Sequence, residues 1–478
     1  MKVKLNKKEF TDRLLGCWIG KNIGGTMGDP FEGKREMLSI TGFTTQKGEP
    51  APNDDLDLQL VWLKALGQYG PKGLGANELA NFWVTHITPN WNEYGISKRN
   101  LEMGLLPPLS GEFQNGGWKN SNGAWIRSEI WACLAPGVPN IAIKYAIMDA
   151  SVDHGQGEGT YAEIFTASLE SMAFFETDIR KVVEKGLEFI PQDCRVAKSV
   201  RIVLDGYDNN VPWQEVRQQI VKDSEDLGWF QAPANVAFTV LGLIYGEGDF
   251  KKSMLYTINC GDDTDCTGAT CGAIMGIVMG AEKIPADWKE YIGDRILTKC
   301  INGEYVRPIP KTCTELVNII MDMVPEVMKA HGVEYELTDG ENEICGNPDD
   351  VLKGNKESFF AKSPYSFEIP SHFDTDAIVE YETEPVVKPG CDFEVKITLK
   401  NKEGFTYYDA FVGLPDGWTA DYERSSYSHI KLDDHYGNVC WKMTIHVGEK
   451  VDGINRVPVV FTPKYGVMPI TVPIVLIG

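Results

Sequence analysis

Hydrophobic positions recur at intervals of three and four residues through most of the first 330 residues. This spacing places apolar side chains on one face of a helix. It is clearest in four segments, which are residues 58–66, 161–175, 235–245 and 312–330. The pattern therefore predicts an all-α domain, a helical bundle, over residues 1–332.

A different pattern follows a polar stretch. Residues 333–357 are rich in Asp, Glu, Asn and Gly, which is typical of a linker. Beyond them, apolar and polar residues alternate in segments 395–400 and 441–447, as they do in half-buried strands. Turn residues such as Pro389-Gly390 separate these segments. We therefore expect residues 358–478 to form an all-β, immunoglobulin-like sandwich.

The most apolar stretch of the helical part carries a regular series of glycines. Residues 267–281 are too few to span a membrane, which takes roughly 20 apolar residues. Gly268, Gly272, Gly276 and Gly280 recur every four residues, so they share one helix face. The series predicts a buried helix that a neighbouring backbone approaches closely.

Charge excludes some partners. The chain has 46 Lys and Arg and 68 Asp and Glu, which gives a net charge of −22. This charge disfavours binding to nucleic acid and to anionic membranes. The 11 cysteines contain no CxxC pair, and the charged start MKVKLNKKEF lacks the apolar stretch of a signal peptide. We expect reduced thiols and a cytoplasmic protein, with homo-oligomerisation left open.

Several familiar sites do not fit the residues present. The segment 16–21 resembles a phosphate-binding loop, but Asn22 follows its Lys where Ser or Thr is needed. A zinc site is disfavoured because His86 and His154 are the only histidines before residue 330. No GxSxG motif of a serine hydrolase occurs.

Carboxylates cluster at two places, each directly before an apolar helical segment. The clusters are Asn53-Asp54-Asp55-Leu56-Asp57 and Asp262-Asp263-Thr264-Asp265. One such cluster is explained by helix capping, since Asp and Asn are favoured N-cap residues. Two together indicate a site for hard divalent cations, which need several oxygen ligands from separate elements. We therefore predict one or two Mg²⁺ ions where the two helices begin.

Four blocks of sequence carry a resemblance to a known family. They are a Gly-rich turn ending in Pro30-Phe31-Glu32-Gly33, the segment 53–56, the segment 122–127 followed by 154–159, and the segment 261–266 followed by Ile284-Pro285-Ala286-Asp287-Trp288. In content and order these blocks resemble the ADP-ribosylglycohydrolases. The resemblance covers residues 11–295.

The resemblance implies an all-α, ADP-ribosylglycohydrolase-like fold that uses Mg²⁺ to cleave the glycosidic bond at C1 of an ADP-ribosyl group on a protein or small molecule. Position by position, it implies metal ligands at Asn53, Asp54, Asp55, Asp263 and Asp265. It implies catalytic roles for Glu32 and Asp263. It implies substrate contacts by Asn122, Gly123, His154, Gly157 and Gly159, the last two in a glycine run whose amides could cradle an anion.

Two departures from the family pattern keep alternatives open. Leu56 and Cys266 stand where the family has oxygen donors, and a thiol is a poor ligand for Mg²⁺. A non-catalytic binding protein of the same fold is one alternative. Another is hydrolysis of a different N- or O-glycoside, such as a nucleoside or a furanoside. The β domain and the aromatic residues of segment 83–131, some in loop-like sequence where rings could stack on a sugar, favour the latter.

Overall fold

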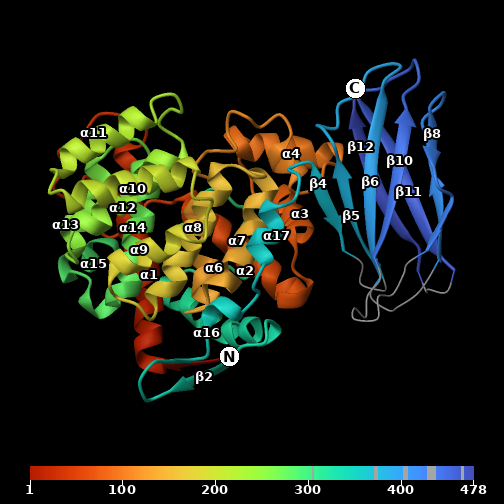
Figure 1. Cartoon of the computed structure of the whole chain (residues 1–478). Coiled ribbons are helices and arrows are strands. Elements are labelled where there is room, and N and C mark those ends of the chain that lie inside the picture. Colours follow the sequence, from red (N-terminus) through yellow and green to blue (C-terminus); the bar gives the residue numbers. More distant parts are fainter. Residues whose placement is uncertain (304–305, 371–374, 402–406, 428–437, 465–467) are drawn as a thin grey trace.

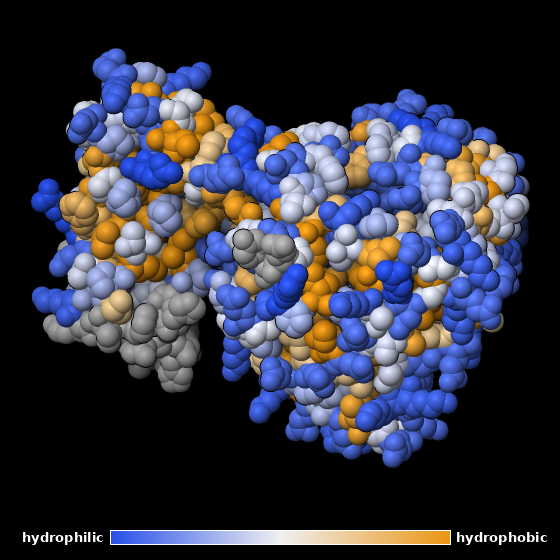
Figure 2. Space-filling view, turned by 180° about the vertical axis from the view of Figure 1, so that it is seen from behind, coloured by the Kyte–Doolittle hydropathy of each residue, from blue (hydrophilic) through white to orange (hydrophobic). Residues whose placement is uncertain are grey.

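The structure is a computed structural model that describes residues 1–478 apart from 304–305, 371–374, 402–406, 428–437 and 465–467. Helices fill one lobe and strands fill the other (Figure 1). Seen from behind, the strand lobe is the smaller, and a narrow waist joins it to the helical lobe (Figure 2).

The helical lobe contains the helices that the apolar spacing predicts, because segments 58–66, 161–175, 235–245 and 312–330 fall on α2, α8, α12 and α16. Its α-helices are α1 (Lys7–Gly28), α2 (Asp54–Gly73), α3 (Ala76–His86), α4 (Asn92–Met103), α5 (Leu109–Glu112), α6 (Glu129–Leu134), α7 (Pro139–Asp153), α8 (Glu158–Ala173), α9 (Ile179–Leu187), α10 (Arg195–Asp208), α11 (Trp213–Asp223), α12 (Ala232–Tyr245), α13 (Phe250–Asn259), α14 (Thr264–Met279), α15 (Ala286–Ile292) and α16 (Cys313–Ala330). Short 3-10 helices lie at η1 (Asp29–Phe31), η2 (Trp125–Arg127), η3 (Ala281–Lys283) and η4 (Pro348–Asp350).

Helices α1 and α14 pack backbone against backbone at the centre of this lobe. The glycine series of α14 contacts a second series in α1, so that Gly16, Gly20 and Gly24 face Gly276, Gly272 and Gly268. A Cβ atom at any of these positions would overlap a carbonyl group of the other helix. The close approach predicted for the glycines of α14 is thus confirmed, and it fixes the end of α1 beside the start of α14.

The acidic segment 333–357, which we expected to be a linker, contains regular structure. Strand β1 (Lys2–Asn6) lies between β2 (Glu334–Thr338), which runs parallel to it, and β3 (Glu343–Cys345), which runs antiparallel. Lys2 pairs with Glu336 and Lys4 with Glu343. The polar composition that suggested a linker therefore belongs to partly exposed strands. Their partner is β1, which lies at the other end of the helical domain in the sequence. Helix α17 (Asn355–Phe360) follows and packs against α7.

The second lobe consists of two antiparallel sheets, with strand orders β4-β5-β6-β10-β8 and β12-β11-β7-β9. The strands are β4 (Ser366–Ile369), β5 (Thr375–Tyr381), β6 (Asp392–Asn401), β7 (Tyr407–Val412), β8 (Thr419–Tyr422), β9 (Ser425–Tyr427), β10 (Asn438–His446), β11 (Ile454–Pro463) and β12 (Ile470–Ile477). Alternate residues of both sheets share one hydrophobic cluster, including Ile397, Trp441 and Phe461. The immunoglobulin-like topology itself stays a prediction.

The lobes are joined by apolar contacts. Leu105, Leu109 and Phe113 of the helical lobe are buried in the hydrophobic cluster of the sheets. Gly104 lies against Val475 of β12. Among the described residues, no helix is both long and apolar enough to cross a membrane.

Candidate functional site

The two carboxylate clusters lie at the starts of α2 and α14, and the structure brings them together. Asn53 caps α2 by accepting a hydrogen bond from the amide of Asp55 at 2.8 Å. Its side-chain amide also donates to Asp265 Oδ2 at 3.3 Å, across from α14. Asp263 occupies the N-cap position of α14. A metal ion can be shared by the two clusters only if the two helix starts meet. The structure shows that they do.

The potential ligand atoms form two overlapping groups. Asp55, Asp265 and Cys266 offer atoms that all lie within 4.8 Å of one another, and so do Glu32, Asp263 and Asp265. Asp265 belongs to both groups. The second group offers only carboxylate oxygens, the donors that Mg²⁺ prefers, whereas the first includes a thiol. Two neighbouring cations could share Asp265.

Unpaired oxygens show that these residues fit a cation. Asp55 Oδ2, Asp263 Oδ1 and Asp265 Oδ1 are buried and have no hydrogen-bond partner among the described residues. Burial, and then the charge of Asp265, raises the pKa of Asp263 well above its usual range. Burial likewise raises the pKa of Asp55 and of Asp265. Burying a carboxylate oxygen without a partner costs free energy. A divalent cation is the simplest group that would satisfy these three oxygens.

Glu32 adds a further carboxylate beside Asp263 and Asp265. It follows η1 and is exposed as a residue, yet one of its oxygens is near enough to Asp263 and Asp265 to complete the second group. Shielding of its carboxyl group from water, together with the charges of Asp265 and Asp54, raises its pKa to about 7. A carboxylate with that pKa can exchange a proton at neutral pH.

Asn122 lies at the same site, next to Asp263. Its side-chain amide donates to Asp263 Oδ2 at 2.6 Å, and its oxygen accepts from the indole of Trp125 at 3.0 Å. Asn122 therefore holds one oxygen of Asp263 and leaves the other free. At Gly123 a side chain would overlap the carboxyl group of Glu93, so this glycine is required by packing.

His154 is fully buried, and both of its ring nitrogens have neighbours. Nδ1 lies 2.9 Å from Asp153 Oδ1, and Nε2 lies 3.0 Å from the hydroxyl of Ser121. The histidine thus supports the segment that carries Asn122. A direct contact between His154 and substrate stays a prediction.

The glycine run after His154 holds the same segment. The amide of Glu158 donates to Asn120 Oδ1 at 3.0 Å, and that of Gly159 donates to the Lys119 carbonyl at 3.3 Å. Gly157 packs against Lys119 and Gly159 against the ring of His154. Two amides of the expected anion cradle are therefore occupied within the protein, and substrate binding by Gly157 and Gly159 stays a prediction.

Asp54 lies near an exposed aromatic residue of segment 83–131, Trp91, as expected for the rings in its loop-like sequence. The hydroxyl of Tyr94 donates to Asp54 Oδ2 at 3.0 Å. The ring of Tyr94 lies 6.2 Å from that of Trp91, which is 50% exposed. Trp91 thus presents an open aromatic face near the carboxylates.

Most of the other aromatic residues of segment 83–131 belong to the core, which corrects the expectation of a stacking surface. Trp83, Phe113, Trp125 and Trp131 are buried. Trp83, Trp125 and Trp131 belong to the core of the helical lobe, and Phe113 belongs to the hydrophobic cluster of the sheets. Of these four, only Phe113 lies in the loop-like sequence that had suggested exposure.

Two lysines near the carboxylates were missed by the sequence reasoning. Lys21 of α1 is buried and donates to Glu129 Oε1 at 2.7 Å. Burial alone would lower its pKa, but the charges of Glu129 and Asp55 outweigh that effect and raise it. Lys21 is therefore a fixed positive charge behind the site. Its pattern in the sequence is that of any helical residue, so no signal marked it.

Lys299 supplies a positive charge on the open side. Burial alone would lower the pKa of Lys299, but the charges of Asp54 and other neighbouring acids raise it. The chain is held there by Asp57, whose Oδ2 accepts from the amides of Lys299 at 2.6 Å and Cys300 at 2.7 Å. Asp57 is thus a positioning residue, although it belongs to the acidic cluster in sequence.

The chain resembles known proteins over its helical part. A sequence model described as ADP-ribosylglycohydrolase matches residues 6–316. An uncharacterised protein of Archaeoglobus fulgidus is 24% identical over 308 residues, which cover 59% of this chain and 92% of that protein. A solved structure described as an ADP-ribosylglycohydrolase-related protein complex matches with a TM-score of 0.44 and 20% identity, covering 67% of this chain and all of that one. The chain belongs to the ADP-ribosylglycohydrolase family, whose members are generally hydrolytic enzymes.

Proposed function

We propose that this protein hydrolyses the glycosidic bond at C1 of an ADP-ribosyl group carried by a protein or a small molecule, and that it requires Mg²⁺. The observation that supports this most is the set of unpartnered oxygens on Asp55, Asp263 and Asp265 beside Glu32. These converging oxygens have no hydrogen-bond partner among the described residues, and they suit a divalent cation.

When bound, Mg²⁺ would supply positive charge that orients sugar hydroxyls and the attacking water. Asp55, Asp263 and Asp265 would hold it, and Asn53 would orient two of them, because its oxygen accepts from the Asp55 amide and its nitrogen donates to Asp265. Asn122 keeps Asp263 in a fixed orientation, since one Asp263 oxygen accepts its amide hydrogen. Lys21 balances part of the negative charge of Asp55 from behind.

In this proposal Glu32 moves the proton. Without metal its pKa is about 7, raised by burial and then by the charges of Asp265 and Asp54, so a bound cation would lower it and keep Glu32 in the ionised form that a general base needs. It would accept a proton from the attacking water while the bond to the leaving group breaks. The neighbouring carboxylates also stabilise the positive charge that grows at C1 as the oxocarbenium-like transition state forms.

Two tryptophan rings that are at least partly exposed, Trp91 and Trp229, offer a surface for the adenosine part of the substrate. Trp91 lies on one side, near Asp54 through Tyr94. On another side the half-buried ring of Trp229 lies next to Gly33, the neighbour of Glu32. Stacking on an adenine would orient the ribose towards the carboxylates.

The decisive experiment measures ADP-ribose released from arginine-linked and serine-linked ADP-ribosyl peptides, with Mg²⁺ or with a chelator. We expect release only with Mg²⁺, and its loss in Asp263→Asn. The matched control is Asp287→Asn, an exposed aspartate paired with Lys251 on the surface, which should retain full activity. If the peptides are untouched but a nucleoside or an aryl furanoside is hydrolysed, the substrate assignment is wrong. If none reacts, the protein is not an enzyme of this class.

A further inference from the structure

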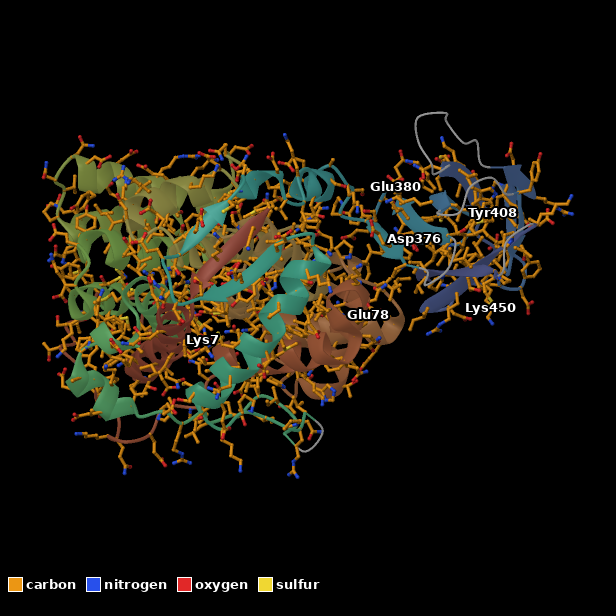
Figure 3. The ribbon with its side chains drawn as sticks, turned by 90° about the horizontal axis from the view of Figure 1, so that it is seen from below. Lys7, Glu78, Asp376, Glu380, Tyr408 and Lys450 are labelled. Carbon is orange, nitrogen blue, oxygen red and sulfur yellow. The ribbon has the colours of Figure 1, made fainter. Side chains whose placement is uncertain are left out.

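A separate cavity lies between the two lobes. It has a volume of about 440 Å³, within the range of small-molecule sites. Its walls come from the start of α3, from α7, from α17 and from β4, and include Glu78, Lys144, Phe359 and Glu368. Figure 3 shows Glu78 on the side of the helical lobe that faces the sheets, which carry Asp376 and Glu380. None of the carboxylates of the proposed active site lines it.

Lys144 on α7 is the unusual residue of this cavity. It is half-buried, and no hydrogen bond or ion pair reaches its ammonium group from the described residues. The ammonium nitrogen of Lys144 lies 5.6 Å from the centre of the Tyr145 ring. Taking a charge out of water without a partner is costly.

Other positive charges lie near Lys144, although Glu78 and Glu368 line the same cavity. After burial, the charges of Lys144 and Lys72 are what lower the pKa of His331, to about 4. Two other lysines line the cavity, Lys362 and Lys400, and Lys362 is already paired with Glu368 at 2.5 Å. The protein as a whole has a net charge of −22. Lys144, which has no ion pair among the described residues, and the nearby Lys72 therefore form a locally positive region.

Polar groups elsewhere in the cavity suit hydroxyl groups. Glu78 lines the cavity without an ion pair to Lys144, and a carboxylate accepts hydrogen bonds from sugar hydroxyls. Asn77 and Gln156 are engaged with backbone carbonyls of segment 359–368 and define the rim. Phe359 offers an apolar face.

We propose that this interlobe cavity is a second binding site, which takes a hydroxylated small anion, a sugar phosphate or a sugar acid. The anionic group pairs with Lys144, and the hydroxyl groups bind to Glu78. The site is independent of the carboxylate centre and of the reaction proposed for it.

The test is calorimetric titration of the full chain with ribose 5-phosphate, glucuronate and inorganic phosphate, with uncharged ribose for comparison. At least one charged sugar should bind, and Lys144→Gln should weaken its binding at least tenfold while keeping most of the side-chain volume. Lys181→Gln, at an exposed lysine near Glu176 and Asp178, should bind like the wild type. Which sugar binds better distinguishes a phosphate from a carboxylate ligand.

Two further measurements separate this site from the active site and from a folding defect. Asp263→Asn should bind the charged sugar as the wild type does, and loss of binding there would place the anion at the carboxylate centre instead. In the wild-type protein, the bound sugar should protect Lys144 from acetylation, as read by mass spectrometry. Absence of binding by every probe, equal binding by Lys144→Gln, or unprotected Lys144 would each overturn the proposal.

Discussion

Gly20 of α1 lies directly against the backbone of Gly272 in α14, so that a methyl group on either residue would overlap a carbonyl group of the other helix. The contact is one of a series along both helices. Because η1 and Glu32 follow α1, while Asp263 and Asp265 stand at the start of α14, the same glycines set the distance between Glu32 and these two aspartates.

Gly20→Ala should therefore lower the free energy of unfolding by about 1–3 kcal/mol, the usual cost of overpacking a rigid contact. The clash is with backbone, which cannot rotate away as a side chain could. Urea denaturation at constant m-value is the measurement. The variant should also lose Mg²⁺ affinity, because separating α1 from α14 moves Glu32 away from Asp263 and Asp265.

The matched control is Gly67→Ala in α2. Gly67 lies in a helix with no atom near its missing side chain, so alanine should stabilise the protein by about 0.4–1 kcal/mol. If both alanine variants changed stability equally, the close packing of α1 on α14 would not be the cause.

Removing one carboxylate should separate stability from metal binding. In the metal-free protein Asp265→Asn should raise the melting temperature, because burial and neighbouring charges penalise an ionised Asp265. Mg²⁺ at 100 times its dissociation constant should stabilise the wild type by about 2.7 kcal/mol and leave the variant unchanged. A variant that is less stable than the wild type without metal, yet still stabilised by Mg²⁺, would contradict the assignment.

The pH dependence of stability should change in Glu93→Gln. Burial raises the pKa of Glu93 to about 7, so the folded protein keeps this proton at pH values where the unfolded chain, with a pKa near 4.3, has released it. Wild-type stability therefore falls as pH rises from about 4 to 7, by up to about 1.4 kcal/mol per pH unit from this group. The glutamine variant should lose that part of the slope.

Thermal melts of both proteins between pH 5 and pH 8, without metal, give the comparison. We expect the variant to gain stability over the wild type towards pH 8 and to differ least at pH 5. Parallel curves would mean that Glu93 ionises in the folded protein as it does in the unfolded chain.

Trp91→Ala should weaken substrate binding without unfolding the protein. The ring is 50% exposed, so its loss removes little packing. If it stacks on the adenine, about 0.5–1.5 kcal/mol is lost, which raises KM about 2- to 12-fold at constant kcat. Phe411→Ala, at a 65% exposed ring of β7 in the other lobe, serves as the control and should leave KM unchanged. An unchanged KM in Trp91→Ala would remove Trp91 from the substrate site.

The helices and the central carboxylates were predictable because their signals are local. Apolar spacing marks α2 and α16, the glycine series marks α14, and the two Asp clusters stand directly before their helices. Lys21 and Lys299 carry no such signal, since each acts on Asp54 or Asp55 from a distant part of the chain.

The sheet of β1, β2 and β3 was missed for a related reason. Each of its strands is short, and β2 and β3 are acidic and partly exposed, so their composition is that of a loop. Their stability comes from pairing with β1 and from the complementary lysines at its surface. A pairing between segments about 330 residues apart leaves no periodic trace in either one.

That pairing also sets an order of events during synthesis. Lys2–Asn6 leaves the ribosome long before Glu343–Cys345, and at about 5–20 residues per second the interval is roughly 15–70 s. Throughout it the first strand has neither partner, and the glycine face of α1 waits nearly as long for α14. The helical domain is therefore completed late, by its last-made strands closing on its first.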